Sequence, residues 1–296
     1  MSKGPVHKFS VSKISDQQLE TAEDLLVTEE PLEIRLNHGS GELRRQDRIA
    51  VTMRTPGHDF ELATGFLFTE GIVAHSYQIL SVRYCLEIKD DAEEDNIVIV
   101  DLDPVVEVDL QKLERNFYIS SSCGVCGKSS IESIQNRGCQ SLPDGNLRMS
   151  FNLITWLPQL ANENQTVFKH TGGLHAAVLF DADGNPVLTR EDVGRHNAVD
   201  KIVGALLAES KIPGSEHILF LSGRAGFELV QKCVIAGIPV IAAVGAPSSL
   251  AVEMAKDFNL TLIGFLRGNR FNVYSGGQRI PHPRPSPTSG DLERDS

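Results

Sequence analysis

A regular alternation of strand and helix patterns near the carboxyl end constrains the fold of this chain more than any other feature. Three apolar runs typical of buried strands alternate with two segments of helical spacing: strands at 217–222, 239–245 and 260–267, helices at 227–236 and 248–258. This order predicts a parallel sheet with right-handed crossovers and helices covering it. In such sheets ligands bind at the carboxyl ends of the strands, near the amino ends of helices.

The rest of the 296 residues suggests a second, smaller unit. Residues 21–110 hold short runs that alternate apolar and polar side chains, at 31–38, 48–56, 79–88, 96–103 and 105–110, and one helical segment, 59–70. We therefore expect a small α+β domain over 21–110 and a larger α/β domain over 111–280. Within the larger domain the pattern also predicts a helix at 151–164, two strands within 167–192, and a helix over 197–210 with Asn197 as its N-cap. The polar ends, 1–20 and 281–296, predict disordered tails.

Charge and composition exclude several classes of protein. Lys and Arg number 28 against 39 Asp and Glu, so the net charge of 28 − 39 = −11 argues against a protein that follows a nucleic-acid backbone. No apolar run reaches the roughly 18 residues that span a membrane, and the first residues lack the apolar core of a secretory signal, so we expect a cytoplasmic protein. Five cysteines, an odd number, make a disulfide framework improbable there.

The pair Cys123 and Cys126 is the first candidate for chemistry. A capping box, Ser129 with Glu132, predicts that a helix begins just after the pair. A thiol before a helix start meets unpaired N–H groups and the positive end of the helix dipole, which favour the thiolate. This placement indicates a nucleophile or a sulfur carrier. A zinc site and a reducible disulfide are the alternatives, but a structural zinc site needs four ligands and there is no second CxxC, so we expect no metal.

Two histidines follow in the segment FKHTGGLHAA. His170 and His175 could relay protons or bind a metal, or they could cap a turn and begin a strand. Zinc nucleotide deaminases carry H-x-E before a P-C-x-x-C motif. Here the histidines come after the cysteines, and Ala177 stands where that chemistry needs glutamate, which argues against deamination. The polar segment 190–197 is either a surface ion-pair cluster or the wall of a site.

Three arginines lie at the expected ends of the parallel strands: Arg224, Arg267 and Arg270. Guanidinium groups beside helix amino ends bind phosphate in bidentate fashion. Although each one alone is more typical of a solvated surface, three at equivalent places favour an anionic, nucleotide-like ligand. The GxGxxG and P-loop patterns are absent, so the site is not an ordinary dinucleotide or NTP site.

With these motifs in view, the sequence resembles the formate dehydrogenase accessory sulfurtransferases, the FdhD family. The matching words, in order over roughly residues 49–274, are RIAVTMRTPGHDFELATGFLFTEGI, SSCGVCGKSSIE, TGGLHAA, REDVGRHNAVDKIVG, SGRAGFELVQKCVIAGIPV, GAPSSLAVEMA and TLIGFLRGNRFNVY. The resemblance implies a cytidine-deaminase-like three-layer α/β domain beside the smaller N-terminal domain. One departure is Gly226, where relatives are expected to carry a hydroxyl group. This departure weakens the expectation of a side-chain contact there.

The resemblance also implies the function. The family accepts persulfide sulfur from a cysteine desulfurase and passes it to the bis(molybdopterin guanine dinucleotide) molybdenum cofactor, a substrate and not a permanently bound group, for the catalytic subunit of formate dehydrogenase. By position, Cys123 is the persulfide carrier and Cys126 assists it. The cofactor-contacting segment falls on Phe265, Leu266, Arg267, Gly268, Asn269 and Arg270, with Arg224 and His175 as further contacts. A homodimer is expected. The alternatives are a cofactor chaperone without sulfur transfer and a zinc-dependent hydrolase of a nucleotide-like substrate.

Overall fold

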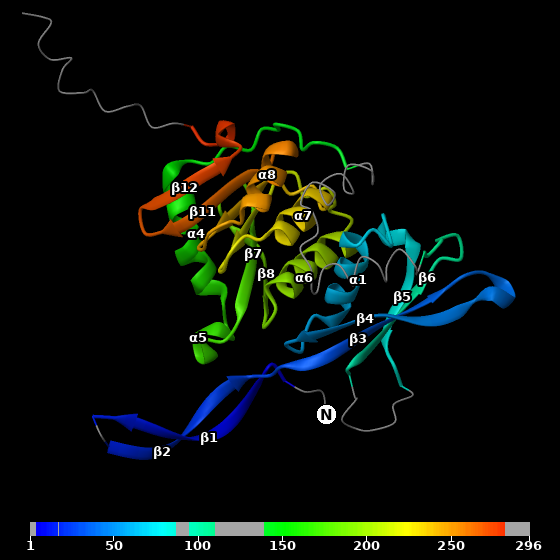
Figure 1. The fold of residues 1–296 in the computed structure, drawn as a ribbon, viewed down its shortest axis with the longest axis horizontal. Helices are drawn as coiled ribbons and strands as arrows, with labels where there is room; N and C mark the ends of the chain where they lie inside the picture. Colours follow the sequence, from blue (N-terminus) through cyan, green and yellow to red (C-terminus); the bar gives the residue numbers. More distant parts are fainter. Residues whose placement is uncertain (1–3, 17, 87–94, 110–138, 282–296) are drawn as a thin grey trace, which may run out of the picture.

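The structure is a computed structural model that describes residues 4–16, 18–86, 95–109 and 139–281. In these residues the strands form a six-stranded sheet, a four-stranded sheet and a two-stranded hairpin (Figure 1). The six-stranded sheet and its helices make up the larger part of the body, and the hairpin projects away from it. No helix among these residues is long and apolar enough to cross a membrane.

The six-stranded sheet is mixed, in the order β12-β11-β10-β9-β7-β8. Its strands are β7 (His175–Phe180), β8 (Pro186–Asp192), β9 (Ile218–Leu221), β10 (Val240–Ala243), β11 (Thr261–Arg267) and β12 (Arg270–Ser275). The pairs β9–β10 and β10–β11 are parallel, which confirms the prediction for this part of the chain. Three pairs are antiparallel: β7 with β9, β7 with β8, and β11 with β12. Strand β12 was not predicted.

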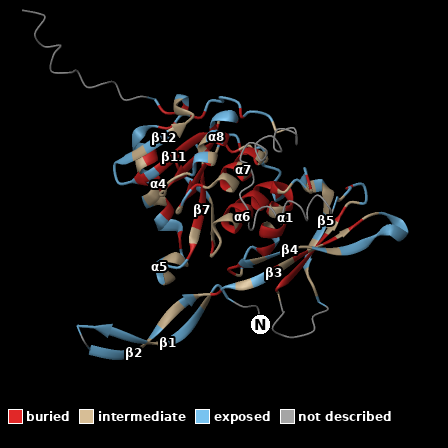
Figure 2. Ribbon diagram, in the orientation of Figure 1, coloured by how far each residue is buried: buried red, intermediate tan, exposed pale blue. Residues whose placement is uncertain are grey.

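Helices cover both faces of this sheet. Helices α6 (Arg195–Ala208), α7 (Phe227–Ile235) and α8 (Ser249–Asp257) lie on one face, and α4 (Phe151–Asn164) lies on the other. The strands alternate accordingly: Leu219 belongs to the core with α6 and α7, whereas Phe220 belongs to the core with α4. The three-layer α/β expectation is therefore confirmed, and Figure 2 shows the buried residues concentrated in these layers. The finer expectation of a cytidine-deaminase-like fold stays a prediction.

The starts of the helices explain one wrong prediction. Ser150 and Ser248 cap α4 and α8 by accepting hydrogen bonds from backbone N–H groups three residues on. Helix α6 instead begins at Arg195 with Gly194 at its N-cap, so Asn197 is not the cap. The Asn197 amide lies inside the first turn because it donates to the Met53 carbonyl oxygen at 2.8 Å and to Asp192 Oδ1 at 3.0 Å.

The four-stranded sheet has the order β4-β3-β6-β5. Its elements are β3 (Glu30–His38), β4 (Arg45–Arg54), helix α1 (Asp59–Thr69), β5 (Ile79–Tyr84) and β6 (Ile97–Leu102). These elements confirm four of the five predicted strands and the helix. Residues 105–109 form no strand, so the fifth prediction is wrong there. The short helices are α5 (Phe168–Thr171) and the 3₁₀ turns Gly41–Leu43, Ser76–Gln78 and Gly277–Arg279.

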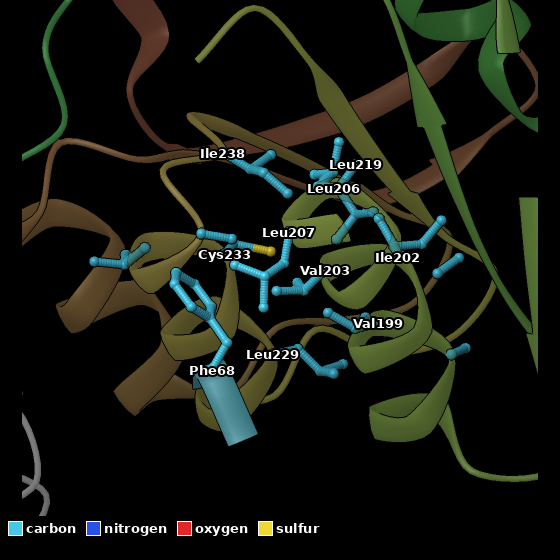
Figure 3. Packing of buried hydrophobic residues seen from close by; sticks show 14 of the residues in the cluster. Phe68, Val199, Ile202, Val203, Leu206, Leu207, Leu219, Leu229, Cys233 and Ile238 are labelled. Carbon is cyan, nitrogen blue, oxygen red and sulfur yellow. The ribbon is translucent and has the colours of Figure 1, made fainter. Parts of the chain in front are cut away.

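The two sheets are connected by the packing of α1 against α6, which depends on one glycine in each helix. A Cβ atom on Gly65 of α1 would lie 1.9 Å from the Asp200 carbonyl oxygen, and one on Gly204 of α6 would lie 1.9 Å from the Glu61 carbonyl oxygen. The two helices therefore pack with their backbones in contact. In Figure 3, Phe68 of α1 lies close to Leu207 of α6 and Cys233 of α7. One hydrophobic core thus runs through both sheets, although the residue limits of the two domains stay a prediction.

The N-terminal hairpin corrects the expectation of a disordered tail over residues 1–20. Strands β1 (Val6–Ser15) and β2 (Gln18–Val27) pair antiparallel along their whole length. Composition could not indicate this hairpin because its backbone ladder, and not a buried apolar core, holds the strands together. The second predicted tail, 281–296, lies outside the described residues except for Pro281.

Candidate ligand-binding site

The loops after β9 and β10 lie side by side at one edge of the large sheet, next to Phe265 near the end of β11. The Gly223 carbonyl oxygen accepts a hydrogen bond from Gly245 N at 2.9 Å, and the Gly245 carbonyl oxygen accepts one from Phe265 N at 3.1 Å. A Cβ atom on Gly245 would lie 2.9 Å from Arg224 Cγ, so only glycine fits this close approach. The predicted convergence of strand ends is confirmed. We call this the site edge, and α7 and α8 begin at it.

His175 belongs to the same edge although its strand runs the other way. It begins β7, whose register pairs Ala177 with Leu221 at the end of β9. The Ser222 hydroxyl oxygen accepts a hydrogen bond from Ala176 N at 2.9 Å, and a Cβ atom on Gly223 would lie 3.2 Å from His175 Nδ1. The structure therefore brings His175 beside the loop that carries Arg224. His170, by contrast, is exposed in α5.

Positive charge accumulates around His175. Burial lowers the pKa of this histidine, and the nearby guanidinium groups of Arg195 and Arg224 lower it further. Burial and the neighbouring Arg195 also lower the pKa of His196, to about 4, so its ring is neutral at pH 7. Its Nε2 atom lies 3.1 Å from Glu228 Oε2 on α7. The sequence left the segment 190–197 open between a site wall and a surface cluster. Arg195 and His196 now lie at the site edge.

Asp192 stabilises the junction between β8 and α6, where Arg195 and His196 lie. Its carboxylate is fully buried, and Oδ1 accepts hydrogen bonds from Gly194 N at 2.8 Å and from Asn197. The other oxygen accepts from Thr55 N at 3.2 Å and lies 2.7 Å from Lys201 Nζ. Asp192 lies in the polar segment 190–197, but no role was predicted for it individually. An Asp two residues before a glycine at a strand-to-helix junction is the local signal that indicates such a role.

The segment 265–270 forms a hairpin and not the strand end and loop that the sequence predicted. Arg267 on β11 pairs with Arg270 on β12, and Gly268 and Asn269 form the turn, with φ +55° at Gly268. All four residues are exposed. Like charges directly opposite one another destabilise a strand pair. An anion bound between the two guanidinium groups would remove this repulsion.

A β-bulge in β11 gives Phe265 and Leu266, the first two residues of the segment 265–270, different surroundings. Gly264 pairs with Asn272 and Arg267 with Arg270, which leaves one extra residue in β11. Leu266 is fully buried in the core with α4, whereas Phe265 is 45% exposed and has φ +52°. A left-handed backbone is costly for an aromatic residue, by about 1–3 kcal/mol, and such strain concentrates at ligand sites.

Replacing Phe265 by glycine tests this strain. We expect the free energy of unfolding to stay unchanged or to rise by up to about 1 kcal/mol, because relief of the left-handed backbone outweighs the roughly 0.5–1 kcal/mol entropic cost of glycine. Urea denaturation measures the change. Phe271→Gly is the matched control: Phe271 packs against the core and has no positive φ, so it should lose about 1.5 kcal/mol or more. Equal losses in both variants would show that Phe265 is not strained.

The predicted thiol site lies outside the residues that the structure describes. Cys123, Cys126 and the helix expected from Ser129 lie within residues 110–138, which the structure does not describe. Of the described cysteines, Cys233 is fully buried, and burial raises the pKa of its thiol far above the ordinary value, so it is no candidate thiolate. Among the described residues no group of three or more His, Cys, Asp or Glu side chains could hold a metal ion.

These features define a three-layer α/β protein that gathers strand ends, helix starts and cationic side chains at one sheet edge. The chain belongs to the FdhD/NarQ family, whose sequence model matches residues 27–281.

Individual relatives are similar over most of their length. The sulfur carrier protein FdhD of Streptomyces coelicolor is 48% identical over 91% of this chain and 94% of its own. The sulfur carrier protein FdhD of Thermoplasma volcanium is 48% identical over 88% of this chain and 90% of its own. Among solved structures, a proposed formate dehydrogenase accessory protein from Desulfotalea psychrophila superposes with a TM-score of 0.70 at 24% identity. The match covers 93% of this chain and 99% of that one, and confirms the fold.

Proposed function

We propose that this protein is a sulfur carrier that serves formate dehydrogenase. The observation that carries the proposal is the 48% identity to a sulfur carrier protein FdhD over nearly the whole of both chains. The placement of Cys123 before an expected helix supports it, since a lowered thiol pKa suits a sulfur nucleophile. The Desulfotalea structure carries the accessory role in its description, which agrees with the proposal.

The chemistry begins with the Cys123 thiolate. It attacks the outer sulfur of a cysteine persulfide on a cysteine desulfurase, so a new S–S bond forms on Cys123 while the S–S bond of the donor breaks. The donor cysteine leaves as a thiolate, and no outside oxidant or reductant is needed. Cys126 assists by shielding or resolving the persulfide. In the second step a second thiol, that of Cys126 or of a reductant, attacks Cys123 Sγ: a disulfide forms, the bond from Cys123 to the outer sulfur breaks, and this sulfur leaves at the sulfide level. The molybdenum of the bis(molybdopterin guanine dinucleotide) cofactor, the substrate of this step, receives it.

The site edge is the part of the chain we assign to the cofactor. Its nucleotide ends carry phosphate, and the cationic groups at the edge are Arg224, Arg267 and Arg270, with His175 beside them. Helices α7 and α8 direct their positive amino ends to the same edge. Phe265, two residues before Arg267 on β11, is 45% exposed. This combination of charges and one ring suits a nucleotide better than a simple inorganic anion.

Removing an arginine from the hairpin tip tests this assignment. Arg267→Ala or Arg270→Ala should weaken the binding of GDP, used as a cofactor surrogate, by about 1.5–3 kcal/mol per lost charge-assisted hydrogen bond. Isothermal titration calorimetry measures the affinity. The control is Arg45→Ala, because Arg45 is exposed on the other sheet and pairs with Asp47 at 2.7 Å. Unchanged GDP affinity in both hairpin variants would place the anion site elsewhere.

Intact-mass spectrometry tests the sulfur chemistry itself. After incubation with a cysteine desulfurase and cysteine, a sulfur carrier gains one sulfur atom that a reductant removes. A cofactor chaperone would bind the pterin cofactor and gain no sulfur, which would overturn the proposal in favour of that alternative. A zinc-dependent hydrolase would carry stoichiometric zinc in metal analysis.

The partners follow from the same proposal. They are a cysteine desulfurase as donor and the catalytic subunit of formate dehydrogenase as the protein that receives the completed cofactor. We expect the protein to act in the cytoplasm as a homodimer.

A further inference from the structure

The arginines at the site edge differ from those of the smaller sheet in having no counter-charge. Every described arginine between residues 30 and 86 forms an ion pair with a carboxylate. Among the residues that the structure describes, no carboxylate pairs with Arg195, Arg224, Arg267 or Arg270. Cationic groups that gather in this way repel one another, so their arrangement favours a bound anion.

These four arginines form two clusters. Arg267 and Arg270 pair across the hairpin tip, whereas Arg195 and Arg224 lie beside His175. Strand β10 lies between β9, which precedes Arg224, and β11, which carries Arg267. Two strand spacings amount to about 10 Å, so the two clusters start from well-separated points of the edge. We call Arg195, Arg224 and His175 the inner cluster.

Arg195 gives the strongest indication that the inner cluster binds a ligand. Its Nε atom is buried, and no atom of the described residues accepts a hydrogen bond from it. Leaving a buried donor of a charged group unpaired is costly, so such a donor indicates an acceptor that a ligand supplies. The amino ends of α6 and α7 add donors at the same edge, because Gly194 and Gly226 stand at their N-caps and neither helix has a side-chain cap.

We propose that the inner cluster is a subsite that binds one phosphoryl group, in addition to the group held at the hairpin tip. This proposal rests on the assignment of the site edge to the cofactor, and it adds Arg195 to the residues that bind it. Phosphoryl oxygens accept hydrogen bonds from a guanidinium group in bidentate fashion and from the N–H groups of a helix amino end. Both kinds of donor are present in the inner cluster.

His175 makes binding at the inner cluster depend on pH. The charged and titratable groups around its ring are Asp192 opposite it on β8, Arg195 and His196 on α6, and Arg224 after β9. Asp192 is already paired with a buried lysine. Burial and the two guanidinium groups lower the pKa of His175, so its ring is mostly neutral at pH 7. A bound anion offsets these positive charges and raises that pKa, so binding takes up a proton and the affinity should rise as the pH falls.

Calorimetry with inorganic pyrophosphate tests the inner cluster. The starting protein is the full-length Arg267→Ala, Arg270→Ala variant, which we call the tip variant because it keeps only the inner cluster. We expect the tip variant to bind pyrophosphate, and the additional change Arg195→Gln to weaken this binding by about tenfold or more. Arg148→Gln is the matched control, because Arg148 is exposed and donates to backbone carbonyl oxygens of its own segment, so the affinity should stay unchanged. A tip variant that does not bind pyrophosphate, or equal affinities after Arg195→Gln and Arg148→Gln, would overturn the proposal.

The pH dependence of the same titration tests the part of His175. The tip variant is compared with its His175→Gln form at each pH, since the titration of the ligand is the same for both. From about pH 8 to about pH 6 the affinity of the tip variant should rise more steeply than that of the His175→Gln form, by at most about tenfold per pH unit, the limit for one proton. Parallel profiles would remove His175 from the subsite and contradict the proposal.

Two further measurements make these results specific. Arg224→Gln changes an exposed residue and should also weaken pyrophosphate binding, so it replaces Arg195→Gln if that variant unfolds at a lower temperature. Unchanged affinity after Arg224→Gln would then overturn the proposal. Sulfur loading and GDP binding at the hairpin tip are measured on proteins with an intact inner cluster. A failure of the inner cluster is therefore distinguishable from a failure of the sulfur-carrier function.

Discussion

Replacement of Cys123 by alanine is expected to abolish both persulfide formation and the maturation of formate dehydrogenase while the protein stays folded. The proposed transfer begins with the Cys123 thiolate, which forms the S–S bond to the incoming sulfur. Mass spectrometry after incubation with a cysteine desulfurase measures persulfide formation, and formate dehydrogenase activity in a strain without the native copy measures maturation. Full maturation by the variant would refute the assignment.

Cys126 provides the informative comparison for this result. If Cys126 only assists, Cys126→Ala should load sulfur on Cys123 and transfer it more slowly. If both cysteines carry sulfur, each single variant should keep part of the activity. Peptide mapping of the wild-type persulfide distinguishes the two cases, and sulfur found solely on Cys126 would reverse their roles. Cys233→Ala is a control for the mass measurement, since that thiol is buried and unreactive.

Removal of the Asp200 carboxylate is expected to give the largest loss of stability. Lys232 Nζ of α7 lies 2.9 Å from both carboxylate oxygens of Asp200 on α6 and 2.9 Å from the Thr69 hydroxyl oxygen of α1. All three residues are buried. Asp200→Ala leaves the ammonium group buried without its counter-charge, at a cost of about 3–5 kcal/mol. Urea denaturation at pH 7 measures this loss.

Two further variants make that result specific. Asp200→Leu combined with Lys232→Met removes both charges and should recover most of the loss, because the desolvation cost of the pair then disappears. Glu209→Ala breaks the exposed Glu209–Lys211 pair, whose atoms lie 2.6 Å apart, and should cost less than about 1 kcal/mol. Equal losses of unfolding free energy in Asp200→Ala and Glu209→Ala would show that the buried pair stabilises the fold no more than an exposed pair does.

Local patterns in the sequence predicted most of the large sheet and its edge. Strands β9 and β10 are apolar and fully buried, and β11 is buried except at Phe265 and Arg267. The helix predicted at 227–236 is followed by Gly237, which has φ +69°. The place of Arg224 at the edge followed from the same alternation. These predictions succeeded because each depends on residues close together in the chain.

The features that were missed depend on distant partners or on backbone pairing. β12 is exposed and polar at several positions, so only its pairing with β11 makes it a strand. The outward turn of Phe265 follows from a bulge that the sequence does not mark. Asn197 has the residue type of an N-cap, but its amide reaches the Met53 carbonyl oxygen, 144 residues away in the chain.

Asp192 has a consequence for how the protein responds to a ligand. Its carboxylate binds Thr55 N, in the connection from β4 to α1, and Gly194 N, at the start of α6. Local opening of the junction between β8 and α6 therefore also breaks the hydrogen bond from Thr55 N to Asp192, which connects the four-stranded sheet to this junction. If the site edge binds a nucleotide as proposed, binding should stabilise these bonds and slow amide hydrogen exchange in β4 and α1, which lie outside the site edge.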